Sequence, residues 1–271
     1  MLGFEIVMKK YAIVIDTSPT EQIVENDDQI FCLGILFGLR SPESFDLVGN
    51  QFPDQDKRIN LRKYAGSSPQ YKSNLKEHLR NIKEADHVLA SASIVNQRFI
   101  KRMGLSVWER AHGKLPEPTD FNKKGKPRYR LGGYKKDDGI VIEPYTVLED
   151  DLCIIGWLAS ELGMLHSAIC KINEEIVKLD VLIDRLPNDQ GPEGINKAEL
   201  LKWTIDKLTD SIIHIAGIPD AADHYQRDLL ADNIAGMCRD LMSSDPIEGK
   251  REIERLLTMT KIYIEKPNNA S

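Results

Sequence analysis

The sequence predicts a layered α/β or α+β domain in which helices cover a β-sheet. Two apolar, β-rich runs lie early in the chain, at residues 11–16 and 30–39, and each is followed by a polar turn that contains proline. Beyond residue 145, long segments with helical periodicity alternate with short apolar runs of strand length. Early strands followed by alternating helices and strands are typical of layered folds.

The first half of the chain supplies most of the predicted strands. Residues 11–16 (YAIVID) form a β-branched run that we expect as a buried strand, and residues 30–39 (IFCLGILFGL) are expected to pair with it. A third strand is expected over residues 45–48, and residues 87–95 are expected to begin as a strand. Residues 74–84 have the pattern of a helix.

The second half of the chain alternates helices with strands. Residues 145–175 carry the longest helical pattern, with apolar side chains recurring every three or four residues. The other expected elements are strands at residues 179–184 and 211–217 and helices at residues 196–208, 223–242 and 247–264.

We expect one domain over residues 1–271, with a basic insertion at residues 104–144 and a closing helix and tail at residues 245–271. The formal net charge is -6, but residues 51–136 contain 20 Lys and Arg against 8 Asp and Glu, a local charge of +12. The remaining residues therefore carry -18. An acidic net charge does not exclude a nucleic-acid partner, because the basic region can form a positively charged surface of its own.

The basic region is densest at residues 123–136 (KKGKPRYRLGGYKK), which we expect as an exposed loop or hairpin because glycine and proline interrupt helix and strand. On residue type alone, a solvated insertion and a nucleic-acid-binding element fit equally well. In a binding element the cations would grip phosphates and the tyrosines would stack on bases. The residues expected in these roles are Lys123, Lys124, Lys126, Arg128, Tyr129, Arg130, Tyr134, Lys135 and Lys136.

Cysteine usage and hydropathy indicate a cytoplasmic protein without a membrane span. The four cysteines lie far apart among apolar neighbours, which favours buried free thiols over a metal site. The first residues do not have the pattern of a signal peptide, and the longest apolar runs fall short of the roughly 18–20 residues of a membrane span. The apolar face of residues 247–264 could pack internally or against a partner, including a second copy of the chain.

Acidic residues end two of the predicted strands. Asp16 ends the first apolar run, and Asp184 ends residues 179–184 in the same way. Carboxylates in such positions project from a rigid sheet edge, where α/β folds build many of their sites. For either residue alone, a turn-forming aspartate that bonds its own backbone is the better interpretation.

A late helix adds His224, Asp228 and Asp232, which are spaced four residues apart and so share one helical face. Two carboxylates at this spacing repel each other, and a neighbouring cation such as Arg227 or a divalent metal ion would relieve the repulsion. Mg²⁺ is held by carboxylates, waters and phosphate oxygens, and two such ions can activate a water for phosphodiester cleavage.

The order of elements resembles an RNase H-like fold, and short motifs resemble a widespread prokaryotic family of that fold. Members of the family open with a strand followed by Asp-Glu-Ser-Gly and close with a helix reading roughly Gln-x-x-Asp-x-Ile-Ala-Gly. YAIVIDTSP places Asp16, LDVLID places Asp184 and LLADNIAGM places Asp232 at the matching positions. The resemblance implies an α/β, RNase H-like mixed sheet flanked by helices and a metal-dependent nuclease.

Two positions depart from the family pattern. Thr17 stands where the family has Glu, and Pro19 stands where it has Gly. If that Glu is a metal ligand, either Asp228 or Asp180, which shares a strand face with Asp184, would have to replace it. Otherwise the chain is an inactive member.

The leading hypothesis is a nuclease that uses Mg²⁺ or Mn²⁺ to hydrolyse phosphodiester bonds of DNA or RNA. Asp16, Asp184, Asp228 and Asp232 would be metal ligands, and His224 would orient a water or the leaving group. The alternative is a catalytically inactive RNase H-like module that binds nucleic acid or a protein partner. A third hypothesis is a metal-dependent phosphohydrolase that acts on small substrates.

Overall fold

The fold was analysed in a computed structural model. The residues that the structure describes are 10–18, 27–39, 61–84, 88–131, 134–135, 141–142, 145–173, 178–183, 197–208, 213–217 and 226–266.

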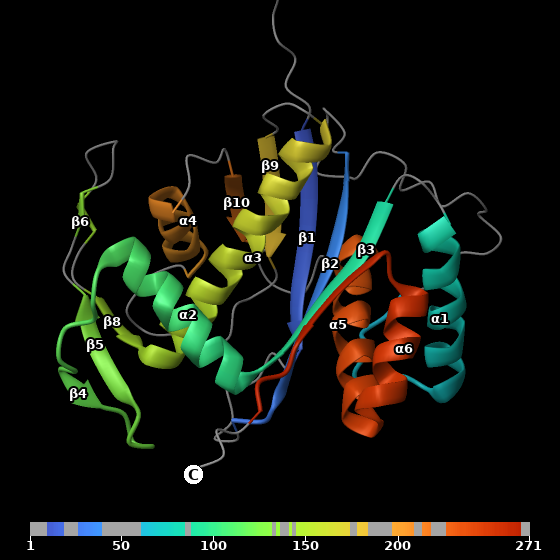
Figure 1. The fold of residues 1–271 in the computed structure, drawn as a ribbon, viewed down its shortest axis with the longest axis horizontal. Coiled ribbons are helices and arrows are strands. Elements are labelled where there is room, and N and C mark those ends of the chain that lie inside the picture. Colours follow the sequence, from blue (N-terminus) through green and yellow to red (C-terminus); the bar gives the residue numbers. More distant parts are fainter. Residues whose placement is uncertain are drawn as a thin grey trace, which may run out of the picture.

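In these residues a mixed sheet of six strands forms the centre of the molecule (Figure 1). The strands are β1 (Lys10–Ser18), β2 (Ile30–Leu39), β3 (Val88–Asn96), β9 (Lys178–Ile183), β10 (Ile213–Gly217) and β11 (Met259–Tyr263). Their order across the sheet is β10–β9–β1–β2–β3–β11. β2 runs antiparallel to both of its neighbours, whereas every other adjacent pair is parallel. The first strand of the chain is therefore central.

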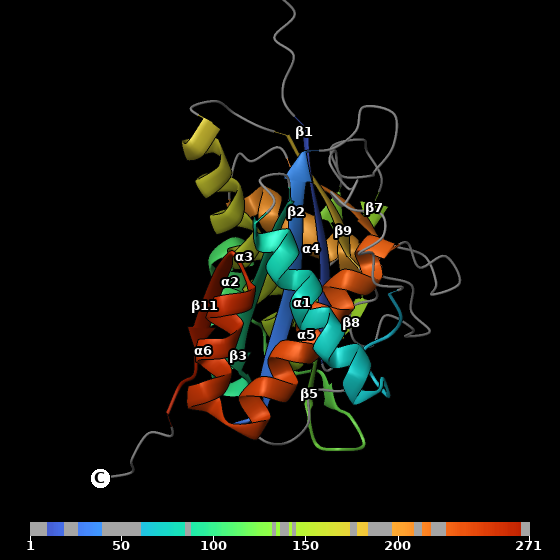
Figure 2. The ribbon, with the colours of Figure 1, turned by 90° about the vertical axis from the view of Figure 1, so that its right-hand side faces the viewer.

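Helices cover both faces of the sheet, as Figures 1 and 2 show from two sides. One layer consists of α2 (Gln97–His112), α3 (Glu149–Asn173) and α4 (Lys197–Leu208). The other layer consists of α1 (Pro69–Glu84), α5 (Gln226–Ser244) and α6 (Pro246–Leu256). The predicted α/β class, a mixed sheet flanked by helices, is confirmed.

Strand side chains alternate between two hydrophobic cores. Ile13 and Ile15 of β1 are buried in the core that contains α2, α3 and α4, whereas Val14 is buried in the core that contains α5 and α1. Because successive strand residues point to opposite faces, a sheet covered on both sides needs continuous apolar runs. This explains why β1 and β2 stand out in the sequence as unbroken hydrophobic segments.

The basic region forms small sheets beside the α2 layer. One has the order β4–β5–β8, formed by β4 (Asp120–Phe121), β5 (Pro127–Leu131) and β8 (Tyr145–Leu148), and the other pairs β6 (Tyr134–Lys135) with β7 (Val141–Ile142). The β4–β5 turn is closed by Asn122, whose side-chain oxygen accepts hydrogen bonds from the backbone N–H groups of Lys124 and Lys126. Gly125 in this turn has φ +73°, which favours glycine. The expected hairpin is therefore present.

Helices α2 and α3 cross at two glycines. A Cβ placed on Gly104 would lie 1.8 Å from the carbonyl oxygen of Cys153, and one on Gly156 would lie 2.0 Å from the carbonyl oxygen of Gly104. Any side chain at either position would therefore force the two helices apart.

Two of the expected helices contain a strand as well. Residues 145–175 begin as β8, and α3 starts only at Glu149. Residues 247–264 divide into α6 and the edge strand β11. In both cases the strand residues continue the apolar spacing of the helix, so periodicity alone could not separate them.

Other predictions differ from the structure at single elements. Helix α2 is absent from the expected elements, and its last residues, up to His112, lie within the expected basic insertion at residues 104–144. β1 continues two residues beyond Asp16, to Ser18. The strand expected at residues 45–48 lies outside the described residues.

Helix α3 is the core helix of its layer. By length and composition, Glu149–Lys171 could cross a membrane, but 67% of its most apolar window is buried inside the molecule. All four cysteines are free thiols; Cys32, Cys153 and Cys238 are buried and Cys170 is half-buried. Burial raises the pKa of the Cys153 thiol to about 12, which keeps it protonated.

Candidate functional site

Asp16 is a buried carboxylate on the central strand. Its residue is only 6% exposed, and its Oδ1 accepts a hydrogen bond of 2.6 Å from the backbone N–H of Thr17. Asp16 pairs with Gly34 of β2, and directly paired residues of antiparallel strands point to the same face. Because Val14, two residues earlier, lies in the α5 core, Asp16 points toward the α5 layer.

Helix α5 touches the sheet directly opposite Asp16. A Cβ on Gly34 would lie 2.2 Å from the carbonyl oxygen of Ala231 and 2.9 Å from the backbone nitrogen of Ala235. The Cβ positions of directly paired strand residues are about 5 Å apart. The structure therefore brings Asp16 beside the turn of α5 that contains Asp232.

Asp232 contacts the segment that precedes α1. Its Oδ2 accepts a hydrogen bond of 2.9 Å from the backbone N–H of Tyr64. The next residue, Asn233, is fully buried; its Nδ2 donates to the carbonyl of Arg62 at 2.8 Å, and its Oδ1 accepts from the hydroxyl of Tyr71 at 2.9 Å. These bonds fasten residues 61–68 to α5, so Asp232 has a structural partner whether or not it binds a metal.

Asp180 lies on the same face of the sheet as Asp16. It is fully buried on β9, where its register partners are Ala12 of β1 and His214 of β10. Its neighbours Leu179 and Val181 belong to the opposite core, so alternation directs Asp180 toward the α5 side. This buried carboxylate is the one that the sequence offered only as a replacement ligand.

The remaining predicted ligands fall outside what the structure describes. Asp184 follows Ile183, the last residue of β9, and His224 precedes α5. Asp228 belongs to α5, but its side chain is outside the described part. Within the described residues, no group of three or more His, Cys, Asp or Glu side chains is arranged to hold a metal. The donors that are described, Asp16 and Asp232, have the oxygen chemistry that Mg²⁺ prefers.

The predicted nucleic-acid-binding cations differ in their surroundings. Lys123 and Lys124 are exposed at the β4–β5 turn, and Arg130 is exposed on β5. Lys126 Nζ lies 2.5 Å from Asp150 Oδ2, and Arg128 lies 3.8 Å from Asp120. Ion-paired cations are less available to a phosphate, so the exposed Lys123 and Arg130 are better candidates than Lys126 and Arg128. The side chains of Tyr134 and Lys135, and the whole of Lys136, lie outside the described residues.

Tyr129 does not fit the predicted stacking role. Its residue is only 6% exposed, and its hydroxyl donates a hydrogen bond of 2.7 Å to Glu149 Oε2. Burial, with a further contribution from this hydrogen bond, raises the pKa of Tyr129 to about 12. The ring packs in the α3 core, because alternation along β5 turns Tyr129 inward and its neighbours Arg128 and Arg130 outward.

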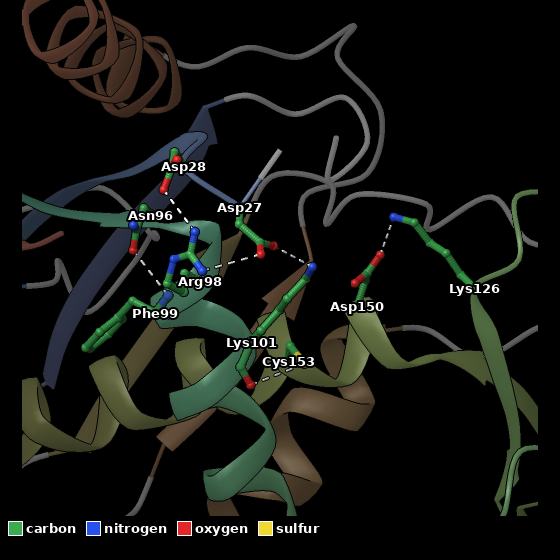
Figure 3. Close-up of polar contacts among 9 residues, drawn as sticks. All are labelled: Asp27, Asp28, Asn96, Arg98, Phe99, Lys101, Lys126, Asp150 and Cys153. Carbon is green, nitrogen blue, oxygen red and sulfur yellow. Dashed lines mark hydrogen bonds and ion pairs between the residues drawn. The ribbon is translucent and has the colours of Figure 1, made fainter. Parts of the chain in front are cut away.

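A second set of cations lies at the start of α2 (Figure 3). Lys101 Nζ lies 2.9 Å from Asp27 Oδ1, and Arg98 lies 3.7 Å from Asp27 and 3.3 Å from Asp28. The hydrogen bond from Lys101 holds the pKa of Asp27 below its ordinary value. These contacts join the segment before β2 to α2 and neutralise both cations.

Comparisons of this chain with protein-family models, with curated proteins and with solved structures find no match to any of them.

Proposed function

We propose that the chain is an RNase H-like nuclease that uses Mg²⁺ or Mn²⁺ to hydrolyse phosphodiester bonds of DNA or RNA. Two features support the proposal: the strand order β10–β9–β1–β2–β3, with β2 antiparallel and β11 added at the edge, and the acidic helix α5 packed on this sheet. The observation that carries the proposal is the position of Asp16, buried on the central strand opposite the turn of α5 that contains Asp232.

In this proposal several carboxylates together coordinate the metal ions. Asp16 and Asp232 would be ligands together with Asp184, and Asp228 would be the fourth. Metal ions held there would supply an activated water and neutralise the leaving oxygen. The Thr17 N–H that bonds Asp16 Oδ1 orients this carboxylate. His224 would orient the water or the leaving group.

Substrate binding is proposed for the basic hairpin. Lys123, Lys124 and Arg130 are exposed, so they can contact phosphates without first breaking a buried interaction. Lys126 and Arg128 would contribute only after exchanging their carboxylate partners for phosphate.

The decisive experiment compares wild-type cleavage of labelled DNA and RNA, in Mg²⁺ or Mn²⁺, with cleavage by Asp16→Asn and Asp232→Asn. We expect each substitution to reduce the rate by at least a hundredfold, because it removes a charged ligand while keeping the side-chain volume. Asp206→Asn, at an exposed residue of α4 that pairs with Lys202, is the matched control and should cleave normally. Equal rates in all four proteins would refute the site.

The asparagine substitution also separates the two roles of Asp232. Asn keeps an oxygen that can accept the hydrogen bond from the Tyr64 N–H, so the fold and the thermal unfolding temperature should be retained. Asp232→Ala removes that acceptor and should destabilise the protein by about 1–3 kcal/mol. If Asp232→Asn cleaves as fast as the wild type, the residue serves only to anchor residues 61–68.

The alternative function is a binding module without catalysis. Two observations favour it: Thr17 stands where the resembled family has Glu, and Asp232 Oδ2 is already bonded to the backbone. A catalytic site predicts that Mn²⁺ raises the unfolding temperature of the wild type but not of Asp16→Asn. Salt-dependent nucleic-acid binding with no effect of Mn²⁺ would favour the module instead. Hydrolysis of mononucleotides that survives deletion of the hairpin would favour a phosphohydrolase of small substrates.

A further inference from the structure

Arg62 and Lys63 are held directly beside Asp232. The backbone N–H of Tyr64 donates to Asp232 Oδ2 at 2.9 Å, and the carbonyl of Arg62 accepts from Asn233 Nδ2 at 2.8 Å. Ordinary covalent geometry then places the Cα of Lys63 within about 5–6 Å of the Asp232 carboxylate. Both residues therefore lie on the segment that is bonded to Asp232 and Asn233 of α5.

The position of Arg62 is reinforced by its own contacts. Its guanidinium lies over the ring of Tyr71, 4.5 Å from the centroid, and its Nη2 donates to Ser68 Oγ at 3.3 Å. Its backbone N–H donates to the hydroxyl of Tyr71 at 3.1 Å. A cation held against an aromatic ring keeps the donors on its free edge for an anion.

Three cations of α1 are paired with carboxylates. Lys72 lies 2.7 Å from Asp240, and Lys76 and Arg80 lie 3.4 and 3.5 Å from Glu252. On the other face, Arg98, Lys101 and Lys126 are paired with carboxylates as well (Figure 3).

Arg62 and Lys63 differ from these cations in their pairing. Within the described part of the chain, neither side chain has a carboxylate partner, and both residues are exposed. Two exposed cations on a segment bonded to the half-buried Asp232, with no carboxylate partner among the described residues, form a site for an anion that is bound at the same place.

We propose that Arg62 and Lys63 form a phosphate-binding site for the nucleic-acid backbone, adjacent to Asp232. The inference rests on the proposed nuclease function. A phosphodiester bound to metal ions at Asp16 and Asp232 would have its oxygens within reach of the Lys63 ammonium group. Arg62 would bind the neighbouring phosphate of the same strand. The basic hairpin lies on the opposite layer, so the two sites would contact the substrate from both faces of the sheet.

The test measures the affinity of the full chain for single-stranded and duplex DNA and RNA oligonucleotides, with Ca²⁺ replacing Mg²⁺, at several salt concentrations. Arg62→Gln and Lys63→Ala are compared with Arg80→Ala, which removes an exposed cation of the same layer that already has a carboxylate partner. Each lost phosphate contact should lower the magnitude of the slope of log K against log salt by about 0.9 for duplex and by about 0.7 for single strands. At 0.1 M salt, this corresponds to a roughly eightfold loss of duplex affinity. Lys63→Arg should restore most of the affinity.

The outcomes are distinguishable. If the wild type binds but does not cleave, while Arg62→Gln and Lys63→Ala bind weakly, the phosphate site stands and the nuclease proposal fails. If the wild type cleaves and both variants keep its affinity and KM within twofold, the nuclease stands and the phosphate site is wrong. The inference is also overturned if the wild type binds none of the four nucleic acids. It is overturned as well if Arg62→Gln and Lys63→Ala weaken the binding of mononucleotides but not of oligonucleotides.

Discussion

His112 lies between two tryptophan rings at the end of α2. Its ring centroid is 4.1 Å from that of Trp108 and 3.9 Å from that of Trp203. Its Nε2 is 3.1 Å from Thr204 Oγ1, and that hydroxyl donates to the carbonyl of Leu200, so the His112 Nε2–H is the donor. Burial, with a smaller effect from the charge of Lys207, lowers the pKa of His112 to about 4.

This pKa predicts a loss of stability in mild acid. The unfolded chain binds a proton at His112 below about pH 6.5, whereas the folded chain does so only near pH 4. The free energy of unfolding should therefore fall as the pH is lowered from 6.5 to 4. Urea unfolding at a series of pH values should give a steeper fall for the wild type than for His112→Gln. Parallel curves for the two proteins would contradict the prediction.

The sequence predicted the strand that carries Asp16 more successfully than it predicted the surroundings of Asp232. Asp16 could be placed because its apolar run, YAIVID, is long enough to define a strand by itself. The bond from Asp232 to Tyr64 spans 168 residues and joins a side chain to a backbone N–H, so no local pattern records it. Tyr129 was misjudged for a related reason: its basic neighbours dominate the composition, although the strand turns its ring inward.

At the scale of elements, close backbone contacts decide how the layers pack. Gly34 allows α5 to approach β2, and Gly104 and Gly156 allow α2 to approach α3. A sequence shows the glycines but not which helix lies against them. The strands β8 and β11 were missed for the same kind of reason, because each exists only through its pairing with β5 or β3.

We expect Gly156→Ala to destabilise the protein even though alanine favours helices. The gain in helix propensity is about 1 kcal/mol, but the new Cβ would lie 2.0 Å from the Gly104 carbonyl oxygen and would separate the helices. Overpacking of this kind costs about 1–3 kcal/mol or more, so the free energy of unfolding should fall. Ser167→Ala, which removes only the hydrogen bond from an exposed hydroxyl of the same helix to the Gly163 carbonyl, is the control for denaturant unfolding. Equal stability of Gly156→Ala and the wild type would show that the helices can move apart freely.

For the whole molecule, the uneven charge of the sequence includes two separate groups of exposed cations, which we propose as phosphate contacts. The β4–β5 hairpin, whose turn contains Lys123 and Lys124, lies beside the α2 layer (Figure 1). Arg62 and Lys63 lie on the segment that is bonded to α5. Arg98 and Lys101, which lie between these two groups in the sequence, form ion pairs with aspartates. The composition could not reveal these pairs. The local charge of +12 therefore overstates what is available to a phosphate backbone.

Replacing both turn lysines should weaken nucleic-acid binding in a salt-dependent way. The double variant Lys123→Ala/Lys124→Ala should lower the slope of log K against log salt by about 1.8 for duplex, with no change in unfolding temperature because both side chains are exposed. Lys250→Ala/Arg251→Ala, at exposed positions of α6, is the charge-matched control. An equal loss in the control pair would mean that the hairpin contributes only net charge.

The central position of β1 has a consequence for how the protein is made. Asp16 and Asp232 are separated by 216 residues, and β9 and β10 pair beside β1 only after most of the chain exists. Contacts between residues so far apart in the sequence form slowly. The chain between them must lose conformational entropy before strand pairing lowers the free energy. Nascent chains released from the ribosome before α5 should therefore lack Asp232 and the second half of the proposed metal site.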